Sequence, residues 1–588
     1  MNFRSCRIDD LLRRTLRYRS ALIRGHLAAV AATLLTVTIP LFIPMLVDEL
    51  LLKKSDTLTH WVATHIMPMS LEGYVFFFLA LVLVLRGLGF LLNVYQVRTF
   101  LGVSKDLAYH LRRSATEHLE RVSLKEYETR SSGAIASRLV TDIATVDSFI
   151  GTTVSKLLIS ILTLLFTAVV LLIINWPLAL FILITNPVVV YFTARLARNV
   201  GRLKREENRA VEAFQSALTE TLELFGQIRA ANKEEYFFSR IVREAKGLRD
   251  RSIDFSFKSD RAMRLSFLVF LGGYELFRSV SILVVAHGTL SVGLMLAVFG
   301  YLWIMMTPTQ DVINFQYALA SARAACRRID GIFAMEREPE ITDGVDPFAG
   351  KEAVEIRTEA LSFSYRKERH ILKNISLEIP AASKVAIVGP SGSGKTTLAN
   401  LLVGFYPVEE GALYYGGVRH DRIALPTIRA HVHVILQHPK LFNDTMLFNL
   451  TLGRKVDETR LAEAIRIAQL EDVVATLEHG LQTPVGRDGV RLSGGQRQRV
   501  AIARMILLDP EVVIFDESTS ALDVHTEAKL FSELQEYLRP KTVITIAHRL
   551  STIEKAEYVF VLEDGRLVDR GTPEELMAKE EGYFARMI

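Results

Sequence analysis

Residues 389–398, GPSGSGKTTL, have the side chains and the spacing that bind the phosphates of a nucleotide. The stretch follows the apolar run KVAIVG and matches G-x-x-x-x-G-K-[ST] in the strand–loop–helix context that this motif needs. Its glycines let backbone N–H groups wrap around phosphates, while Lys395 neutralises the β- and γ-phosphates and Thr396 binds Mg²⁺. The predicted ATP-binding residues of this loop are Gly389, Ser391, Gly392, Gly394, Lys395, Thr396 and Thr397.

A second acidic motif, EVVIFDES, supplies the other half of this chemistry. An apolar strand that ends in a carboxylate places Asp516 at the edge of a sheet, where we expect the metal. Glu517 follows directly and is positioned as the base that polarises the attacking water. Two solvated acids would be a fair alternative for the motif alone, but a phosphate-binding loop upstream favours catalysis.

Three further residues follow apolar runs and are weak signals when each is taken alone. His548 in ITIAHRL is placed to reach a γ-phosphate, although a lone histidine is more often structural. Gln437 in LQHPKLF is placed to touch the metal or the water. Tyr365 in LSFSYRK is placed to stack on adenine, and an ordinary surface tyrosine is nearly as good an explanation.

The stretch RLSGGQRQRV, residues 491–500, predicts a second anion site. A Ser-Gly-Gly run that opens a polar helix directs free N–H groups and the positive end of the helix dipole the same way. The chain therefore has two predicted phosphate-binding segments, but only one set of the other residues that would bind and hydrolyse a nucleotide.

These motifs occupy the second part of a chain whose first part is apolar. Half of its 588 residues are hydrophobic, and the long apolar runs lie before about residue 310. A spanning helix needs about 20 apolar residues. Six spans are predicted, at Leu27–Val47, Tyr74–Val94, Val154–Ile174, Leu178–Phe192, Leu265–Ala286 and Leu290–Pro308.

Arginines beside these runs predict the topology. They concentrate near the N-terminus and in the two long loops, between spans two and three and between spans four and five. The positive-inside rule then places both long loops and both termini in the cytosol. Arginines in these places indicate membrane topology rather than nucleic-acid binding, and two cysteines, Cys6 and Cys326, suit a reducing compartment.

The predicted fold class is an α-helical transmembrane domain followed by an α/β P-loop domain with a mostly parallel sheet. The predicted domains are a basic amphipathic surface helix over residues 1–26, the six-span domain with its long cytosolic loops over 27–329, a linker over 330–353 and the nucleotide-binding domain over 354–588.

The motifs, in this order, resemble the nucleotide-binding domain of ABC transporters, with LSGGQ the most specific among them. The six spans with two long cytosolic loops resemble an exporter-type (type IV) half-transporter. The resemblance implies that Tyr365 stacks on adenine, that Gln437 binds the metal and senses ATP, and that His548 contacts the γ-phosphate. It also implies that Asp523 crosses a dimer interface.

The same resemblance implies a dimer. Ser493, Gly494, Gly495 and Gln496 of one chain contact ATP that is held by the P-loop of its partner, so two chains make two composite sites. The intact motifs favour a homodimer over a heterodimer. Two departures bear on coupling: the loop TPVGRDG has Pro484 and Arg487 at positions that are often acidic, and Ala231 stands where an aromatic residue is frequent.

The predicted function is export or flipping of an amphipathic substrate, such as a lipid, lipid-linked compound, drug or peptide, across the plasma (bacterial inner) membrane. ATP and Mg²⁺ are the expected cofactors. One alternative is an importer, for which we expect an additional N-terminal ligand-binding domain. The other is a non-transporting ATP-gated regulator, for which we expect the loss of catalytic residues.

Three charges inside apolar runs, Arg86, Glu275 and Arg278, are further candidates. A charge at mid-bilayer costs ~2.5–3.5 kcal/mol on the insertion scale, so each needs a partner or water. Arg86 and Glu275 are predicted at similar depth and fit an interhelical pair. Glu275 and Arg278 are three residues apart and fit a local pair equally well. Contact with the substrate is the third possibility.

Overall fold

The computed structural model describes residues 3–54, 61–62, 64–65, 69–130, 132–341, 344–365, 370–486, 492–516, 524–547 and 550–579, without the side chains of 183, 185–200, 266, 270, 313, 524–528 and 551–552. The chain divides into two compact units. The first comprises Met1–Leu119 and Gly133–Ala334, and the second comprises Glu120–Ser132 and Met335–Ile588.

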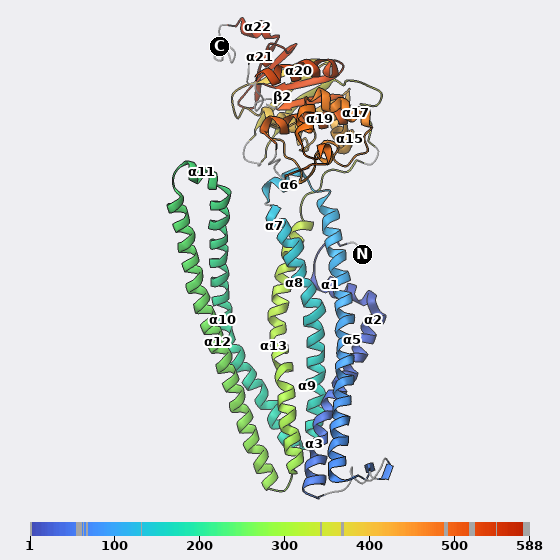
Figure 1. The fold of residues 1–588 in the computed structure, drawn as a ribbon, viewed down its shortest axis with the longest axis vertical. Coiled ribbons are helices and arrows are strands. Elements are labelled where there is room, and N and C mark those ends of the chain that lie inside the picture. Colours follow the sequence, from blue (N-terminus) through green and yellow to red (C-terminus); the bar gives the residue numbers. More distant parts are fainter. Residues whose placement is uncertain are drawn as a thin grey trace. The chain divides into compact units, whose positions relative to one another are not determined.

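The first unit is built from helices (Figure 1). Four of them have 42 to 53 residues, about twice the length that crosses a bilayer, so each can continue beyond it. These long helices are α5 (Leu71–Leu119), α10 (Trp176–Glu223), α12 (Glu234–Ala286) and α13 (Val292–Phe333). The shorter ones are α1 (Ile8–Thr15), α2 (Arg19–Thr38), α3 (Phe42–Pro44), α7 (Ser132–Ser137), α8 (Ile143–Ser148), α9 (Val154–Ile174) and α11 (Phe225–Ala230).

Five helical stretches in the described part of the chain are long and apolar enough to cross a membrane. They contain or overlap the first, second, third, fifth and sixth predicted spans. The fourth predicted span, Leu178–Phe192, falls within α10, where several side chains are not described. The count of six spans therefore stays a prediction.

The N-terminal segment packs against other helices of the first unit. The basic stretch predicted as one surface helix is divided, because α1 ends at Thr15 and α2 begins at Arg19 after a 3-10 turn. Leu11 of α1 is buried in a cluster with residues of α5 and α13. The Sγ atoms of Cys6 and Cys326 lie 3.0 Å apart in the same cluster, as free buried thiols.

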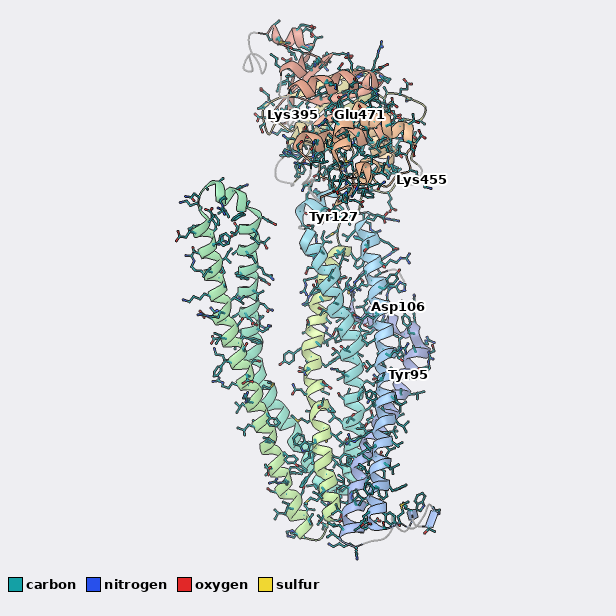
Figure 2. All side chains as sticks on the ribbon, viewed as in Figure 1. Tyr95, Asp106, Tyr127, Lys395, Lys455 and Glu471 are labelled. Atoms are coloured by element: carbon teal, nitrogen blue, oxygen red, sulfur yellow. The ribbon has the colours of Figure 1, made fainter. Side chains whose placement is uncertain are left out.

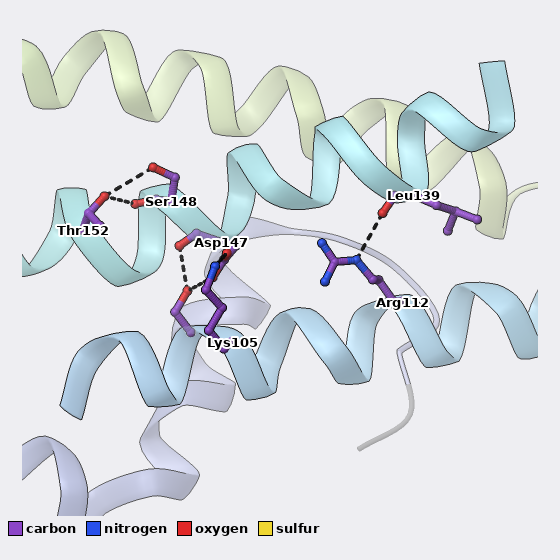
Figure 3. Close-up of polar contacts among 7 residues, drawn as sticks. Lys105, Arg112, Leu139, Asp147, Ser148 and Thr152 are labelled. Carbon is purple, nitrogen blue, oxygen red and sulfur yellow. Dashed lines mark hydrogen bonds and ion pairs between the residues drawn. The ribbon is translucent and has the colours of Figure 1, made fainter. Parts of the chain in front are cut away.

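Polar contacts join α5 to α8 and to the π-helical turn Arg138–Asp142 that precedes α8 (Figure 3). Asp147 accepts a hydrogen bond of 2.6 Å from the Ser104 hydroxyl and pairs with Lys105. The helices approach closely beside this pair, because a Cβ atom on Gly151 would lie 2.9 Å from the Cβ of Ser104. A glycine is therefore required there.

A carboxylate holds the start of α13. Asp48 belongs to the π-helix Met45–Leu51 and is buried. It accepts hydrogen bonds from the Ser291 hydroxyl at 2.5 Å and from the Gly293 backbone N–H at 3.0 Å. A negative charge is favourable at this position because the N-terminus of a helix is partially positive.

The second unit contains a six-stranded sheet in the order β12-β11-β3-β10-β9-β6. Strands β11, β3, β10, β9 and β6 run parallel, and β12 pairs antiparallel at the edge. These strands are β3 (Lys384–Val388), β6 (Val432–Ile435), β9 (Val512–Asp516), β10 (Thr542–Ile546), β11 (Tyr558–Glu563) and β12 (Arg566–Gly571). The mostly parallel sheet predicted from the sequence is confirmed.

An antiparallel sheet in the order β2-β1-β4-β5 completes the second unit. Its strands are β1 (Ile356–Phe363), β2 (Leu372–Ile379), β4 (Glu410–Tyr415) and β5 (Val418–Arg419). Phe348, within the predicted linker, is buried and stacks on His431 with ring centroids 4.8 Å apart. The end of that stretch therefore packs into the second unit.

Helices of the second unit include α6 (Leu124–Thr129), α14 (Lys395–Leu402), α19 (Gly494–Leu508), α20 (Val524–Leu538) and α22 (Pro573–Met577). Of these, α6 comes from the loop between the second and third predicted spans. It belongs by its contacts to the second unit, although the chain before and after it belongs to the first.

Candidate ATP-binding and hydrolysis site

The phosphate-binding loop connects β3 to α14. Gly389, Gly392 and Gly394 have φ angles of +147°, +82° and +101°, which L-residues rarely adopt. A Cβ atom on Gly389 would lie 2.0 Å from the Leu562 carbonyl oxygen, so this position requires glycine. The loop that the sequence predicts from its spacing is formed in the structure.

Lys395 opens α14 in the second unit (Figure 2). Its side chain is buried, and its ammonium donates hydrogen bonds of 2.9 Å to the carbonyl oxygens of Gly389 and Pro390. The charge is therefore held inside the curve of the loop. That is where the glycine backbone places its N–H groups, so the arrangement suits a triphosphate.

Asp516 and Thr396 meet beside this loop. Asp516 is the last residue of β9 and is buried. It lies opposite Ile546 of the neighbouring strand β10. The Thr396 hydroxyl donates a hydrogen bond of 3.3 Å to an Asp516 carboxylate oxygen. A hydroxyl and a carboxylate are hard oxygen donors of the kind that Mg²⁺ prefers, so these two residues fit the predicted metal.

Tyr365 contacts the first turn of α14. Its hydroxyl is 3.2 Å from the Thr397 hydroxyl. Its ring makes edge contacts with Phe363 and Tyr406, at centroid distances of 5.0 and 5.2 Å. The half-buried ring thus lies next to the phosphate-binding loop, as an adenine platform requires.

The segment that carries Gln437 is tied to α19. Gln437 follows β6, the neighbour of β9, and its carbonyl oxygen accepts a hydrogen bond of 3.3 Å from Gln498. Gln498 is buried and did not appear among the predicted site residues. Its place in the polar run RQRV, next to the predicted anion site, was the available signal.

Ser493 and Gln496 cap α19 with each other. The Ser493 hydroxyl accepts from the Gln496 backbone N–H at 3.2 Å, and the Gln496 side chain accepts from the Ser493 N–H at 2.7 Å. This capping box fixes the helix start at Gly494 and Gly495. The reciprocal spacing Ser-x-x-Gln was readable in the sequence.

Three predicted residues, Glu517, Asp523 and His548, lie outside the described residues, as does Arg487. Glu517 comes directly after Asp516, and His548 directly after Ala547, whose N–H bonds the Ile387 carbonyl oxygen at 3.2 Å. Pro484 begins β8 (Pro484–Val485), which pairs with β7 (Asp444–Thr445).

The intramembrane charges occur on two helices. Glu275 and Arg278 form an ion pair of 2.6 Å on α12, with about half of each side chain exposed. Arg86 is on α5, and within the described ranges no ion pair joins it to Glu275. The geometry corresponds to the local pair, which was one of the three expectations.

Comparisons with known proteins bear on the whole chain. The sequence model described as "ABC transporter transmembrane region" matches residues 22–309, and the one described as "ABC transporter" matches residues 372–520. An "ATP-dependent lipid A-core flippase" of Burkholderia pseudomallei (strain 1710b) is 30% identical over 571 residues, covering 96% of this chain and 92% of that protein. The chain belongs to the ABC transporter family.

Two other comparisons agree with that assignment. A protein of the same name from Burkholderia orbicola (strain AU 1054) is 31% identical to the transporter over 488 residues, which cover 82% of this chain and 81% of that one. The solved structure of a bacterial Atm1-family ABC exporter with ATP bound has a TM-score of 0.80 at 24% identity and covers 97% of each chain. That likeness shows the same fold.

The predicted family, fold class and enzyme activity are therefore confirmed. The transporter is an exporter-type half-transporter that crosses the membrane several times, binds ATP and couples its hydrolysis to transport. The second unit is called the nucleotide-binding unit below, and the first the membrane unit.

Proposed function

We propose that this transporter flips an amphipathic lipid-type molecule across the membrane by ATP-driven alternating access. The observation that carries the proposal is the 30% identity over 96% of the chain to a protein named ATP-dependent lipid A-core flippase. The described membrane helices are consistent with it, because α5 and α12 expose large apolar side chains along their length, including Phe90, Leu91 and Leu268.

The proposed hydrolysis uses the residues gathered around the phosphate-binding loop. Lys395 neutralises the β- and γ-phosphates, and Tyr365 stacks on adenine. Thr396, Asp516 and Gln437 would hold Mg²⁺, and the ion would supply positive charge to stabilise the γ-phosphate during hydrolysis. Glu517 polarises the attacking water, and His548 contacts the γ-phosphate.

The proposed assembly is a homodimer with two composite ATP sites. Ser493, Gly494, Gly495 and Gln496 face the partner's ATP, and Asp523 lies at the interface. The tip of the α10–α12 hairpin supports a second contact with the partner. It exposes Leu222 at 59%, Tyr236 at 62% and Phe238 at 42%, apolar area that a docked partner would remove from water.

The proposed location is the plasma membrane, the inner membrane of a bacterium, with both termini and the nucleotide-binding unit in the cytosol. The support for it is the concentration of arginine in the long loops. The domain limits at residues 26, 329 and 353 remain part of the proposal, although α13 continues to Phe333.

The test is reconstitution into liposomes that contain a fluorescent phospholipid or a lipid A-type glycolipid. We expect ATP to move the labelled lipid between leaflets and the lipid to stimulate ATPase activity, with Lys395→Ala abolishing both. A panel of amphipathic drugs and peptides serves as the comparison. Stimulation by one of these and not by lipid would contradict the lipid assignment, and movement toward the cytosolic leaflet only would indicate import.

A further inference from the structure

Helix α6 and the residues just before it contact the rest of the nucleotide-binding unit at several points. The Lys125 ammonium pairs with Glu409 at 3.4 Å, and the Arg121 guanidinium pairs with Glu340 at 2.6 Å. The Tyr406 hydroxyl donates a hydrogen bond to the Glu128 carboxylate. Both Tyr406 and α6, which carries Tyr127 (Figure 2), belong to this unit, so the contact lies within one compact body.

The ring of Tyr406 packs against Tyr365, the proposed adenine platform. It is 2% exposed and meets the Tyr365 ring edge-on, at 5.2 Å and 88°. It also contacts Phe363 at 5.4 Å, and Tyr365 in turn reaches Thr397 of α14. Contacts therefore run without interruption from α14 through Tyr365 and Tyr406 to Glu128.

We propose that Tyr406 is a positioning residue that makes the placement of α6 depend on the adenine base. The proposal rests on the proposed role of Tyr365 as the adenine platform. A purine that stacks on Tyr365 fixes the ring of Tyr365, and close packing leaves Tyr406 few alternative rotamers. The hydroxyl of Tyr406 then holds Glu128, and thereby α6, in one place.

The chemistry of the hydrogen bond suits this role. Burial, together with the hydrogen bond to Glu128, raises the pKa of Tyr406 well above that of a free phenol. Tyr406 therefore stays protonated and donates to the carboxylate at any physiological pH. Hydrogen bonds to an ionised acceptor are stronger and more directional than neutral ones.

The test measures amide hydrogen exchange of residues 124–129 in the full transporter in lipid nanodiscs. The ligands are the β,γ-imido analogues of ATP and CTP, each at saturation. A pyrimidine covers less of Tyr365 than a purine does. We expect exchange in wild type to be about five-fold slower with the ATP analogue than with the CTP analogue, the lower end of typical coupling between sites.

Tyr406→Phe keeps the ring and removes the hydroxyl, and we expect it to abolish this difference between the two analogues. Glu128→Ala, a change at an exposed position, should do the same and serves if Tyr406→Phe does not fold. The matched control is Tyr414→Phe, whose hydroxyl donates to Glu359 at 3.0 Å on the exposed surface of the same unit. It should retain the difference.

Two results would overturn the proposal. In one, Tyr406→Phe exchanges at the wild-type rates with both analogues and so keeps the five-fold difference. In the other, it speeds exchange with both analogues by the same factor, which indicates that Tyr406 only anchors α6. Tyr365→Ala tests the proposed ATP site independently of Tyr406. Unchanged affinity for the ATP analogue in that variant would show that Tyr365 is not the adenine platform.

Discussion

The two oppositely charged residues of the ATP site, Lys395 and Asp516, are held in place by the elements that carry them. Lys395 is held by the carbonyl oxygens of its own loop, and Asp516 by the end of a buried strand. Neither side chain needs a large rearrangement to meet a phosphate or a metal. Catalysis that depends on positioning and charge is favoured when the charged groups are organised before the substrate binds.

Glu517→Gln should separate ATP binding from hydrolysis. The variant keeps the size of the side chain and loses the base, so we expect the turnover number to fall by ~10²–10⁴-fold, with ATP affinity retained. Steady-state ATPase activity and equilibrium binding of labelled ATP check this. The control is Glu536→Gln on the exposed side of α20, which should hydrolyse ATP like wild type. Near-normal turnover in Glu517→Gln would remove Glu517 as the base.

His433 on β6 should make the nucleotide-binding unit sensitive to acid. Burial, with smaller effects from Arg504 and Arg454, lowers the pKa of His433 to about 4. An unfolded histidine titrates near 6.5, so the unfolded chain binds the additional proton between these values. Stability is therefore fully present above about pH 6.5 and falls as the pH drops toward 4, by about 2 kcal/mol at pH 5.

Thermal melting of the purified transporter at pH 7.5 and 5.0 checks this expectation. His433→Gln should lose less stability between the two pH values than wild type does. The exposed His479 provides the matched control, since His479→Gln should keep the wild-type pH dependence. An identical pH response in wild type and His433→Gln would contradict the assignment.

At the scale of elements, helix starts and the segments beside them are held by side chains far away in sequence. Asp48 caps α13 from 243 residues away, and Gln498 ties α19 to the segment of Gln437 over 61 residues. The second contact joins the helix that faces the partner's ATP in the proposed dimer to the segment proposed to sense the chain's own ATP. One hydrogen bond thus connects the helix that begins within LSGGQ to the segment that carries Gln437.

Asp48→Ala should destabilise the membrane unit. It removes a charged acceptor from the Ser291 hydroxyl and the Gly293 N–H, which we expect to cost about 1–3 kcal/mol. The melting temperature in detergent measures the effect. Asp48→Asn keeps one acceptor oxygen and should be affected less. Melting of Asp48→Ala at the wild-type temperature would show that the cap contributes nothing.

The sequence predicted the elements whose signals are local. The phosphate-binding loop follows from eight consecutive residues, and the central parallel strands follow from uninterrupted apolar runs. The strands of the antiparallel sheet β2-β1-β4-β5 were not predicted, because the alternation in β1 is interrupted: two exposed residues separate buried Thr358 from buried Leu361, where the register shifts. The contact between Glu128 and Tyr406 was not predictable, since 278 residues separate the two and no local pattern marks either one.

At the scale of the whole molecule, one chain has one phosphate-binding loop and one LSGGQ segment. In the proposed homodimer, each ATP is enclosed by two chains, so the free energy of ATP binding favours the closed dimer. Moving a two-state equilibrium from 1:99 to 99:1 takes ~5.5 kcal/mol of differential binding. Two enclosed ATP molecules are a sufficient source of that difference.

Mixed dimers test this arrangement. Lys395→Ala and Ser493→Ala should each depress ATPase activity, and mixing them should produce dimers in which one of the two sites has no substitution. We expect one ATP occluded per mixed dimer. Verified mixed dimers with no functional site would count against composite sites.

Ser493 also caps α19, so Ser493→Ala carries the cost of a lost cap, typically about 1 kcal/mol. Thr572→Ala is the matched control, because Thr572 and Glu575 form the same reciprocal cap on α22. We expect this control to hydrolyse ATP like wild type. Equal loss of activity in the two variants would assign the effect to capping.

The discontinuous make-up of the nucleotide-binding unit has a consequence for biogenesis. Residues 120–132 leave the ribosome before the rest of that unit, residues 335–588, has been made. At ~5–20 residues per second, translation of the intervening stretch of about 200 residues takes roughly 10–40 s. During that interval α6 has no docking surface, while later membrane helices are still being inserted. Maturation of this unit is therefore tied to completion of the membrane helices, and a fragment that begins at Met335 would lack the partner of Tyr406.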